Sequence, residues 1–310
     1  MARLGAEFRG VDPDLRVAAR LLPGGYGLHR GVTVPRALMN LAVRAGRRKG
    51  VQSVAVNADV SVRVHRPVRA AQPGPALLWI HGGGTVMGGA GQEDGFCRRL
   101  SNFTDVSIAA VDHRLAPEYP YPTPLEDCYA ALTWLTRQPW VDPTRVAVGG
   151  ASAGGGFAAA LALLARDRGE IAPALQMLVY PMLDDRTGAS PNQRPRVMWS
   201  ARDNQIAWQC YLGSADPHTA VPARRADLAG LPPAWIGVGS MDLFYDESLA
   251  YGRRLQQAGI PTDVHIADGA FHAFDMIAPN TSISQHFFAD QCRALRKALV
   301  EHLVHGNPEV

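Results

Sequence analysis

This chain of 310 residues has a small net charge and few cysteines. The formal net charge is only +3, and no basic stripe interleaved with aromatic residues is present, so the sequence gives no indication of nucleic-acid binding. The cysteines are too far apart to form a Cys-x-x-Cys pair or a cluster of metal ligands; they are Cys97, Cys128, Cys210 and Cys292. We therefore expect reduced thiols and no metal site.

A long apolar run is also missing. The longest nearly apolar stretch, residues 154–165, is too short to cross a bilayer. The first residues contain acids and Pro13 instead of an apolar core, so they do not match a secretory signal. We therefore expect a cytoplasmic protein without stable membrane association. A helix expected over residues 34–45 is followed by basic residues, yet we expect its free face to be solvated, because few bulky apolar residues are present to insert into a membrane.

The composition is that of an ordinary globular protein, with 47% hydrophobic and 19% charged residues. From about residue 51 onward, short apolar segments alternate with helical patterns. Such alternation favours an α/β fold, with a mostly parallel central sheet and helices on both faces. In sheets of this kind, catalytic groups gather beyond the carboxyl ends of the strands. The loops after predicted strands are therefore the places to seek functional residues.

The most informative stretch surrounds Ser152. Val146–Val148 has the β-branched or small residues of a buried strand, and the residues after Gly154 favour a helix. Between them lies Gly150-Ala-Ser-Ala-Gly154, a Gly-x-Ser-x-Gly match in the strand-turn-helix context of a nucleophilic serine. Such a serine projects from a strained turn, where side chains at the two glycines would collide with backbone. The amide of Ala153 would lie at the helix N-terminus, where an oxyanion can form.

The glycines of this stretch also invite comparison with two other glycine-rich motifs, a dinucleotide-binding pattern and a P-loop. Gly154, Gly156 and Ala159 fit the dinucleotide-binding pattern Gly-x-Gly-x-x-Ala. However, the first glycine of that pattern should follow the strand directly, and this strand is expected to end near Val148. A phosphate-binding P-loop is excluded because no lysine follows the glycines. A catalytic Ser152 is the favoured interpretation, and it requires a base elsewhere in the chain.

A second glycine-rich loop follows the predicted buried strand Ala76–Ile80. Its sequence is His81-Gly82-Gly83-Gly84. Consecutive glycines let backbone amides approach a substrate closely, as an oxyanion hole requires. We expect His81 to brace this loop by hydrogen bonds rather than act as a base, because it lies on the side of the site whose amides would donate hydrogen bonds to the oxyanion. A plain flexible loop is the alternative, and the position directly after a central strand disfavours it.

The best candidates for the base and its partner are His272 and Asp242, each of which follows a predicted strand. An imidazole within reach of Ser152 would take its proton, and Asp242 would fix the tautomer and stabilise the imidazolium. Asp246 competes with Asp242 but is expected to cap the following helix. The other late histidines fall within a strand or near the terminal helix, so His272 is the preferred base. The chain order Ser, Asp, His is that of α/β-hydrolases.

These motifs together resemble the hormone-sensitive-lipase-like carboxylesterases, the HGGG or bacterial family IV branch of the α/β-hydrolase superfamily. The matching segments are residues 81–84, 112–118, 150–155, 242–247 and 269–274. The resemblance implies an α/β-hydrolase fold with a helical cap. It implies a triad of Ser152, Asp242 and His272, and an oxyanion hole made of the amides of Gly82, Gly83 and Ala153. His81 and Gly84 would support the oxyanion loop.

The resemblance also divides the chain into parts. We expect residues 1–50 to form the N-terminal part of the cap, residues 51–183 the first part of the catalytic domain, residues 184–227 a cap insertion, and residues 228–310 the second part of the catalytic domain. An apolar pocket is usually lined by aromatic side chains. The candidates for lining it are Thr85, Trp199, Trp208 and Tyr211.

Four positions depart from the family pattern. Members usually have Asp at Ala151, Tyr at His113, Gly at Ala273 and an aromatic residue at Thr85. None of these departures removes a catalytic group, so they bear on substrate preference more than on activity.

The implied function is hydrolysis of small-molecule esters with short to medium acyl chains, through an acyl-enzyme on Ser152 and without a cofactor. Amide, lactone or carbamate substrates stay open on the same triad. The alternative from another functional class is a non-catalytic, ligand-binding relative of these enzymes. Such a protein would be expected to lack a triad member, commonly the histidine, whereas His272 is present. The oligomeric state is open, with a homodimer as one option.

Overall fold

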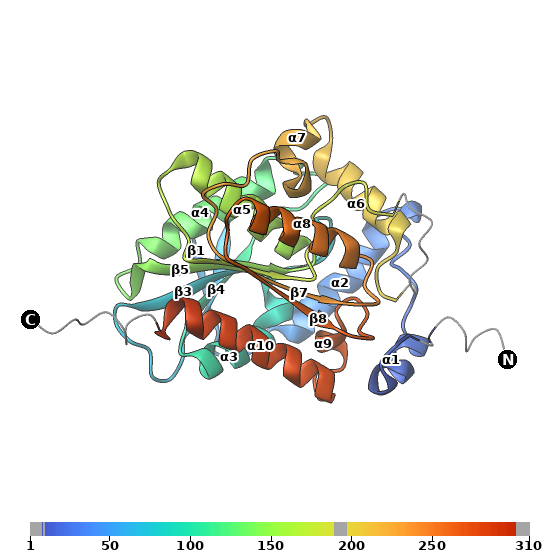
Figure 1. The fold of residues 1–310 in the computed structure, drawn as a ribbon, viewed down its shortest axis with the longest axis horizontal. Helices are drawn as coiled ribbons and strands as arrows, with labels where there is room; N and C mark the ends of the chain where they lie inside the picture. Colours follow the sequence, from blue (N-terminus) through green and yellow to red (C-terminus); the bar gives the residue numbers. More distant parts are fainter. Residues whose placement is uncertain (1–7, 9, 189–196, 302–310) are drawn as a thin grey trace, which may run out of the picture.

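The computed structural model describes residues 8, 10–188 and 197–301 of the chain. Within these residues one sheet of eight strands runs through the molecule, in the order β1-β2-β4-β3-β5-β6-β7-β8 (Figure 1). The strands are β1 (Gln52–Ala55), β2 (Ser61–His65), β3 (Gly74–Ile80), β4 (Ser107–Asp112), β5 (Val141–Ala151), β6 (Leu175–Val179), β7 (Ala234–Gly239) and β8 (Thr262–Ala267).

The sheet is parallel from β4 to β8, and β2 is antiparallel to both of its neighbours, β1 and β4, so it alone among the eight strands runs in the opposite direction. β1 and β2 form an edge hairpin, and the side-chain oxygen of Asn57 closes its turn by accepting the amides of Asp59 and Val60, each at 2.9 Å. The prediction of a mostly parallel α/β sheet is therefore confirmed.

Helices cover both faces of the sheet. In Figure 1, α3 and α10 lie below the sheet, whereas α4, α5 and α8 lie above it. The buried strand β3 alternates between the two layers: Leu78 and Ile80 pack in one apolar core, and Leu77 and Trp79 in the other. The helices are α1 (Arg16–Leu21), α2 (Thr33–Gly46), α3 (Asp94–Thr104), α4 (Thr123–Thr136), α5 (Ala153–Arg168), α6 (Ala201–Leu212), α7 (Pro217–Ala220), α8 (Tyr245–Gln257), α9 (Phe274–Ile277) and α10 (Ser282–Leu299), with short 3-10 turns at η1 (Pro13–Leu15), η2 (Leu28–Arg30), η3 (Ala90–Glu93) and η4 (Pro222–Arg224).

The N-terminal segment and the insertion after residue 183 contact each other. The carboxylate of Asp203, in the first turn of α6, accepts hydrogen bonds from the amides of Tyr26 and Leu28, both at 2.9 Å. These hydrogen bonds join residues that are 177 and 175 positions apart in the sequence. These are the two segments that we expected to build a cap.

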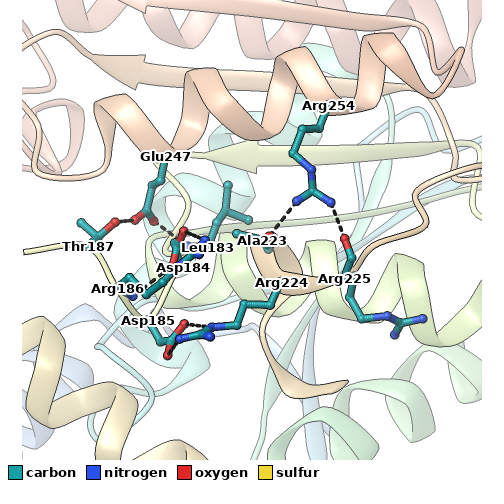
Figure 2. A network of polar contacts seen from close by, with 10 residues as sticks. All are labelled: Leu183, Asp184, Asp185, Arg186, Thr187, Ala223, Arg224, Arg225, Glu247 and Arg254. Atoms are coloured by element: carbon teal, nitrogen blue, oxygen red, sulfur yellow. Dashed lines mark hydrogen bonds and ion pairs between the residues drawn. The ribbon is translucent and has the colours of Figure 1, made fainter. Parts of the chain in front are cut away.

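A polar network joins residues 183–187 and 223–225, near the two ends of the expected insertion, to α8 (Figure 2). The buried carboxylate of Glu247, on α8, accepts the amide of Leu183 at 2.6 Å and the hydroxyl of Thr187. Arg254, also on α8, donates to the carbonyl oxygens of Ala223, at 2.6 Å, and Arg225, while Arg224 joins the two ends of the segment through two hydrogen bonds to Asp185, at 2.6 and 2.7 Å. Burial raises the pKa of Glu247 well above its usual range.

The orientation of α2 differs from the expectation. The sequence pattern places Leu38, Met39, Leu41 and Ala42 toward one side of the helix, and we expected its free face to be solvated. Instead, Met39 turns inward, whereas Leu38 and Leu41 are 63% and 60% exposed. The helix is apolar on two sides, and only one of them packs on the domain. None of the helices in the described ranges has the length and hydropathy that a membrane crossing requires.

Candidate active site

Ser152 stands at the junction of β5 and α5. Its backbone angles, φ 57° and ψ −121°, are strained for a residue with a side chain. The two flanking glycines are required by close packing: a Cβ on Gly150 would lie 2.4 Å from the carbonyl oxygen of Gly154, and one on Gly154 would lie 2.0 Å from that of Ile80. The sharp turn therefore forms only where these side chains are absent, and it lifts the Ser152 hydroxyl clear of the strand.

Three side chains from separate loops meet at this turn. Nε2 of His272, in the loop after β8, lies 2.9 Å from Oγ of Ser152. Nδ1 of the same ring lies 2.8 Å from Oδ2 of Asp242, in the loop after β7. All three residues are buried, and Asp242 is completely so. A carboxylate at Nδ1 fixes the proton on that nitrogen, which leaves Nε2 free to accept the hydroxyl proton.

The other side of the Asp242 carboxylate is also held. Its Oδ1 accepts the amide of Phe244 at 2.9 Å. Asp246, the sequence competitor, lies instead in the first turn of α8. The rings of Tyr180 and Phe244 pack edge-on against the imidazole of His272, with centroids 5.0 and 5.1 Å away. The imidazole is thus fixed both by hydrogen bonding and by packing.

A half-buried acid, Asp275, lies behind His272. The hydroxyl of Tyr180 donates to Oδ1 of Asp275 at 2.9 Å. Burial raises the pKa of Asp275 to about 6, and the bond from Tyr180 opposes this rise. Ala273, between these residues, has φ 59°, in the left-handed region that favours glycine. This conformation explains why glycine is the usual residue at this position in the family that the motifs resemble.

The glycine loop after β3 faces the same site, but not all of its amides are free. The amide of Gly82 donates to Oε1 of the buried Glu93 at 3.2 Å. By contrast, within the described residues the amides of Gly83, Gly84 and Ala153 donate to no other group. We expected Gly82, Gly83 and Ala153 to supply the oxyanion donors. The structure engages the first of these amides with a carboxylate and leaves that of Gly84 free.

His81 contacts the loop that it begins. Its Nδ1 lies 2.8 Å from the carbonyl oxygen of Gly82, and its ring stacks on that of His113 at 4.5 Å with an angle of 2° between planes. Burial, and then the neighbouring His81, lower the pKa of His113 to about 3, so this ring is neutral at ordinary pH. The two rings together form one wall behind the glycine loop.

A cavity of about 280 Å³ opens onto Ser152 and His272. Trp199 lines it, as we expected, and stands so close to Gly84 that a Cβ there would lie 2.1 Å from the indole ring. The lining comes from the glycine loop, from the N-terminal segment and from α9; it includes Tyr26, Met39, Ala42, Gly82, Gly83, Gly84, Met276 and Ile277. The N-terminal segment was expected in the cap, but no motif in the sequence marks Tyr26, Met39 or Ala42 as lining residues.

The other expected pocket residues lie elsewhere. Thr85, Trp208 and Tyr211 surround a separate void of about 10 Å³, behind Ala153 and Phe157. The hydroxyl of Thr85 donates to the carbonyl of Ala207 in α6, so this residue faces the insertion rather than the cavity. Three of the four expected residues therefore pack beside the site without lining its main cavity.

The position of Trp199 depends on a short chain of contacts. Its indole nitrogen donates to Oδ1 of Asn204 at 3.4 Å, and the amide group of Asn204 donates to the carbonyl of Thr187 at 3.1 Å. Thr187 in turn donates to Glu247 (Figure 2). One wall of the cavity is thus connected to α8, the helix that follows Asp242.

Comparison with known proteins agrees with this architecture. Residues 77–276 match a family defined by the α/β hydrolase fold. The chain belongs to the α/β-hydrolase family. It falls in the hormone-sensitive-lipase-like branch, as the motifs indicated, and it is a hydrolase.

Similar proteins cover this α/β-hydrolase almost from end to end. It is 37% identical over 284 residues to the esterase LipI of Mycobacterium tuberculosis (strain ATCC 25618 / H37Rv), a match that covers 86% of this chain and 89% of that one. Among solved structures, it is similar to a bacterial heroin esterase, with a TM-score of 0.84, 36% identity and coverage of 94% and 99%. It is also similar to the esterase LipW from Mycobacterium marinum, with a TM-score of 0.87, 33% identity and coverage of 95% and 98%.

Proposed function

We propose that this α/β-hydrolase is a serine carboxylesterase. The observation that carries the proposal is the hydrogen-bonded series Asp242–His272–Ser152, with distances of 2.8 and 2.9 Å, at a cavity of about 280 Å³. A serine hydroxyl is a weak nucleophile at neutral pH, and this arrangement is the one that activates it. The names of the similar proteins, which are esterases, support the choice of ester bonds.

In the proposed mechanism, Nε2 of His272 takes the proton of Ser152 as Oγ attacks the ester carbonyl. Asp242 stabilises the imidazolium that forms. The imidazolium then gives its proton to the departing alcohol, which leaves an acyl group on Ser152. Water, deprotonated by the same imidazole, attacks this acyl-enzyme and releases the acid.

The oxyanion donors are proposed to be the amides of Gly83, Gly84 and Ala153. These amides have no hydrogen-bond acceptor in the part of the chain that the structure describes, whereas that of Gly82 is held by Glu93. A donor that is already bonded to a carboxylate would first have to give up that bond. In sites of this kind, loss of one donor costs about 3 kcal/mol of transition-state stabilisation. Gly82 and His81 then serve to hold the loop in place.

The proposed substrates are small esters with short to medium acyl chains. A cavity of about 280 Å³ is at the small end of ligand pockets, which span roughly 300–1,000 Å³. We propose that residues 1–50 and 184–227 form the cap over it, so that substrate enters beside Tyr26 and Trp199. Amide, lactone and carbamate substrates would use the same groups and are outcomes of the test.

The test is hydrolysis of p-nitrophenyl esters from acetate to palmitate, with p-nitroanilides in parallel and with Ser152→Ala as the matched variant. The expected result is turnover that is highest for short chains and vanishes in Ser152→Ala, with circular dichroism unchanged. Faster cleavage of the anilides would replace the ester assignment by an amide one. A folded wild type that cleaves none of these substrates, or a Ser152→Ala variant that cleaves them equally, would overturn the proposal.

A further inference from the structure

The outer face of α2 is an apolar surface that the described chain leaves uncovered. Val34, Leu38 and Leu41 are 69%, 63% and 60% exposed, and Ala37 and Ala45 are exposed beside them. Successive helical residues turn by about 100°, so these five positions fall within one sector of about 100°. We call this sector, Val34, Ala37, Leu38, Leu41 and Ala45, the outer face of α2.

An exposed apolar sector of this kind is unusual, because α2 already has a second apolar side. Pro35 and Val43 are buried and Met39 is half-buried on that side, which packs against the domain. The polar residues Arg36, Asn40 and Arg44 share one side of α2, so its apolar surface is wider than the part that packs on the domain. Contiguous exposed apolar surface on a soluble domain marks a place of contact with another surface.

The charge around α2 indicates what that surface is. From Leu15 to Ala58 the chain carries eight basic residues and no acidic one; they are Arg16, Arg20, Arg30, Arg36, Arg44, Arg47, Arg48 and Lys49. The whole chain has a net charge of only +3, so positive charge is concentrated in this segment. Arg36 is paired with Glu118, at 2.7 Å. Within the described residues, Arg44, Arg47, Arg48 and Lys49 have exposed side chains and form no ion pair.

We infer that the outer face of α2 docks on an anionic lipid surface. An exposed apolar sector with lysine and arginine at its border is the pattern of a helix that lies in the plane of a membrane interface, with its leucines in the acyl boundary and its cations at the headgroups. The second apolar sector distinguishes this helix from an ordinary amphipathic one. The docking is peripheral and needs no membrane-spanning helix. It replaces the expectation from the sequence that the free face of this helix is solvated and that the protein has no stable membrane association.

The docked helix is also a wall of the active-site cavity. Met39, on the inner side of α2, and the exposed Ala42 beside it line the cavity that holds Ser152. α1 lies on the same side of the molecule (Figure 1), and its Val17 and Leu21 are 66% and 81% exposed. Docking would therefore hold the cavity beside the lipid surface, where amphiphilic esters concentrate. This inference goes beyond the proposed function and does not require it.

The experiment is flotation of the full chain with vesicles of phosphatidylglycerol and, separately, of phosphatidylcholine. We expect binding to the anionic vesicles that weakens as salt is raised, because exposed charges are screened. The double variant Leu38→Gln/Leu41→Gln should bind at least tenfold more weakly. The triple variant Arg47→Gln/Arg48→Gln/Lys49→Gln should lose roughly fivefold for each charge removed. The matched control is Val68→Gln, which removes a 96% exposed apolar side chain from the loop between β2 and β3 and should bind as the wild type does.

Other outcomes separate this inference from its rivals and from the proposed function. All of these variants should hydrolyse a soluble ester as the wild type does, and Ser152→Ala should still bind vesicles. The inference is overturned if the wild type does not bind anionic vesicles, or if Leu38→Gln/Leu41→Gln binds as tightly as Val68→Gln. It is also overturned if sedimentation shows that Leu38→Gln/Leu41→Gln dissociates a dimer while vesicle binding is unchanged, since the face would then pair two copies of the chain.

Discussion

Replacement of Asp242 by asparagine is the most informative single change at the site. Asparagine fits the same space and can keep the bond to the amide of Phe244, now 2.9 Å from Oδ1. It places an NH2 group, however, where a carboxylate oxygen lies 2.8 Å from Nδ1 of His272. The ring then accepts at Nδ1 and carries its proton on Nε2, which faces Ser152. The base would have its proton on the wrong nitrogen.

The expected result is a fall in kcat of about 10⁴, equivalent to about 5.5 kcal/mol of barrier. Stability should change little, because the geometry and the Phe244 bond are kept. The assay is steady-state hydrolysis of p-nitrophenyl acetate, with Asp246→Asn as the matched control, since that aspartate lies four residues later in the first turn of α8. We expect the control to retain at least a fifth of the activity. If Asp242→Asn remained active and Asp246→Asn did not, the assignment of the triad acid would be refuted.

Three further predictions follow from the surroundings of the site. Trp199→Ala should raise kcat/KM for bulky esters relative to acetate, because the indole fills the cavity above the glycine loop; an unchanged ratio would place the substrate elsewhere. Glu247→Ala should lower the free energy of unfolding by about 2–3 kcal/mol, because the buried amide of Leu183 and the half-buried hydroxyl of Thr187 lose their acceptor, whereas Glu247→Gln should recover most of it in urea unfolding. Burial raises the pKa of Asp275 to about 6, so the contribution of its protonated carboxyl to stability is present at low pH and is lost as pH rises through 6. Relative to Asp275→Asn, the free energy of unfolding of the wild type should fall by about 2 kcal/mol between about pH 4.5 and pH 7.5. A difference between the two proteins that stays constant over this range would contradict the raised pKa.

Much of the architecture could be predicted because its signals are local. The strand-turn-helix pattern around Ser152 is contained in a dozen residues, and the parallel sheet follows from alternating strands and helices. Since parallel strands end at one edge, loops after β3, β5, β7 and β8 had to converge, which brought Asp242 and His272 to the serine. No long-range information was needed to expect that convergence.

The parts that sequence analysis missed depend on packing between distant segments. The amide of Gly82 is engaged only because η3 and the start of α3 place Glu93 beneath the glycine loop. Whether Thr85 and Tyr211 face the cavity or a void depends on how α6 lies over α5. For α2, the sequence shows two apolar sectors but cannot indicate which of them packs inward. Periodicity defines the faces of a helix, and tertiary contacts select between them.

The most direct test of the account is to trap the acyl-enzyme. Rapid mixing with p-nitrophenyl acetate, followed by an acid quench and peptide mass spectrometry, should show a burst of one nitrophenol per chain and an acetyl group on Ser152. Ser152→Ala should show neither, and Asp242→Asn should acetylate slowly at the same residue. Acetylation at another residue, or turnover in the wild type with no acyl group on Ser152, would contradict the account.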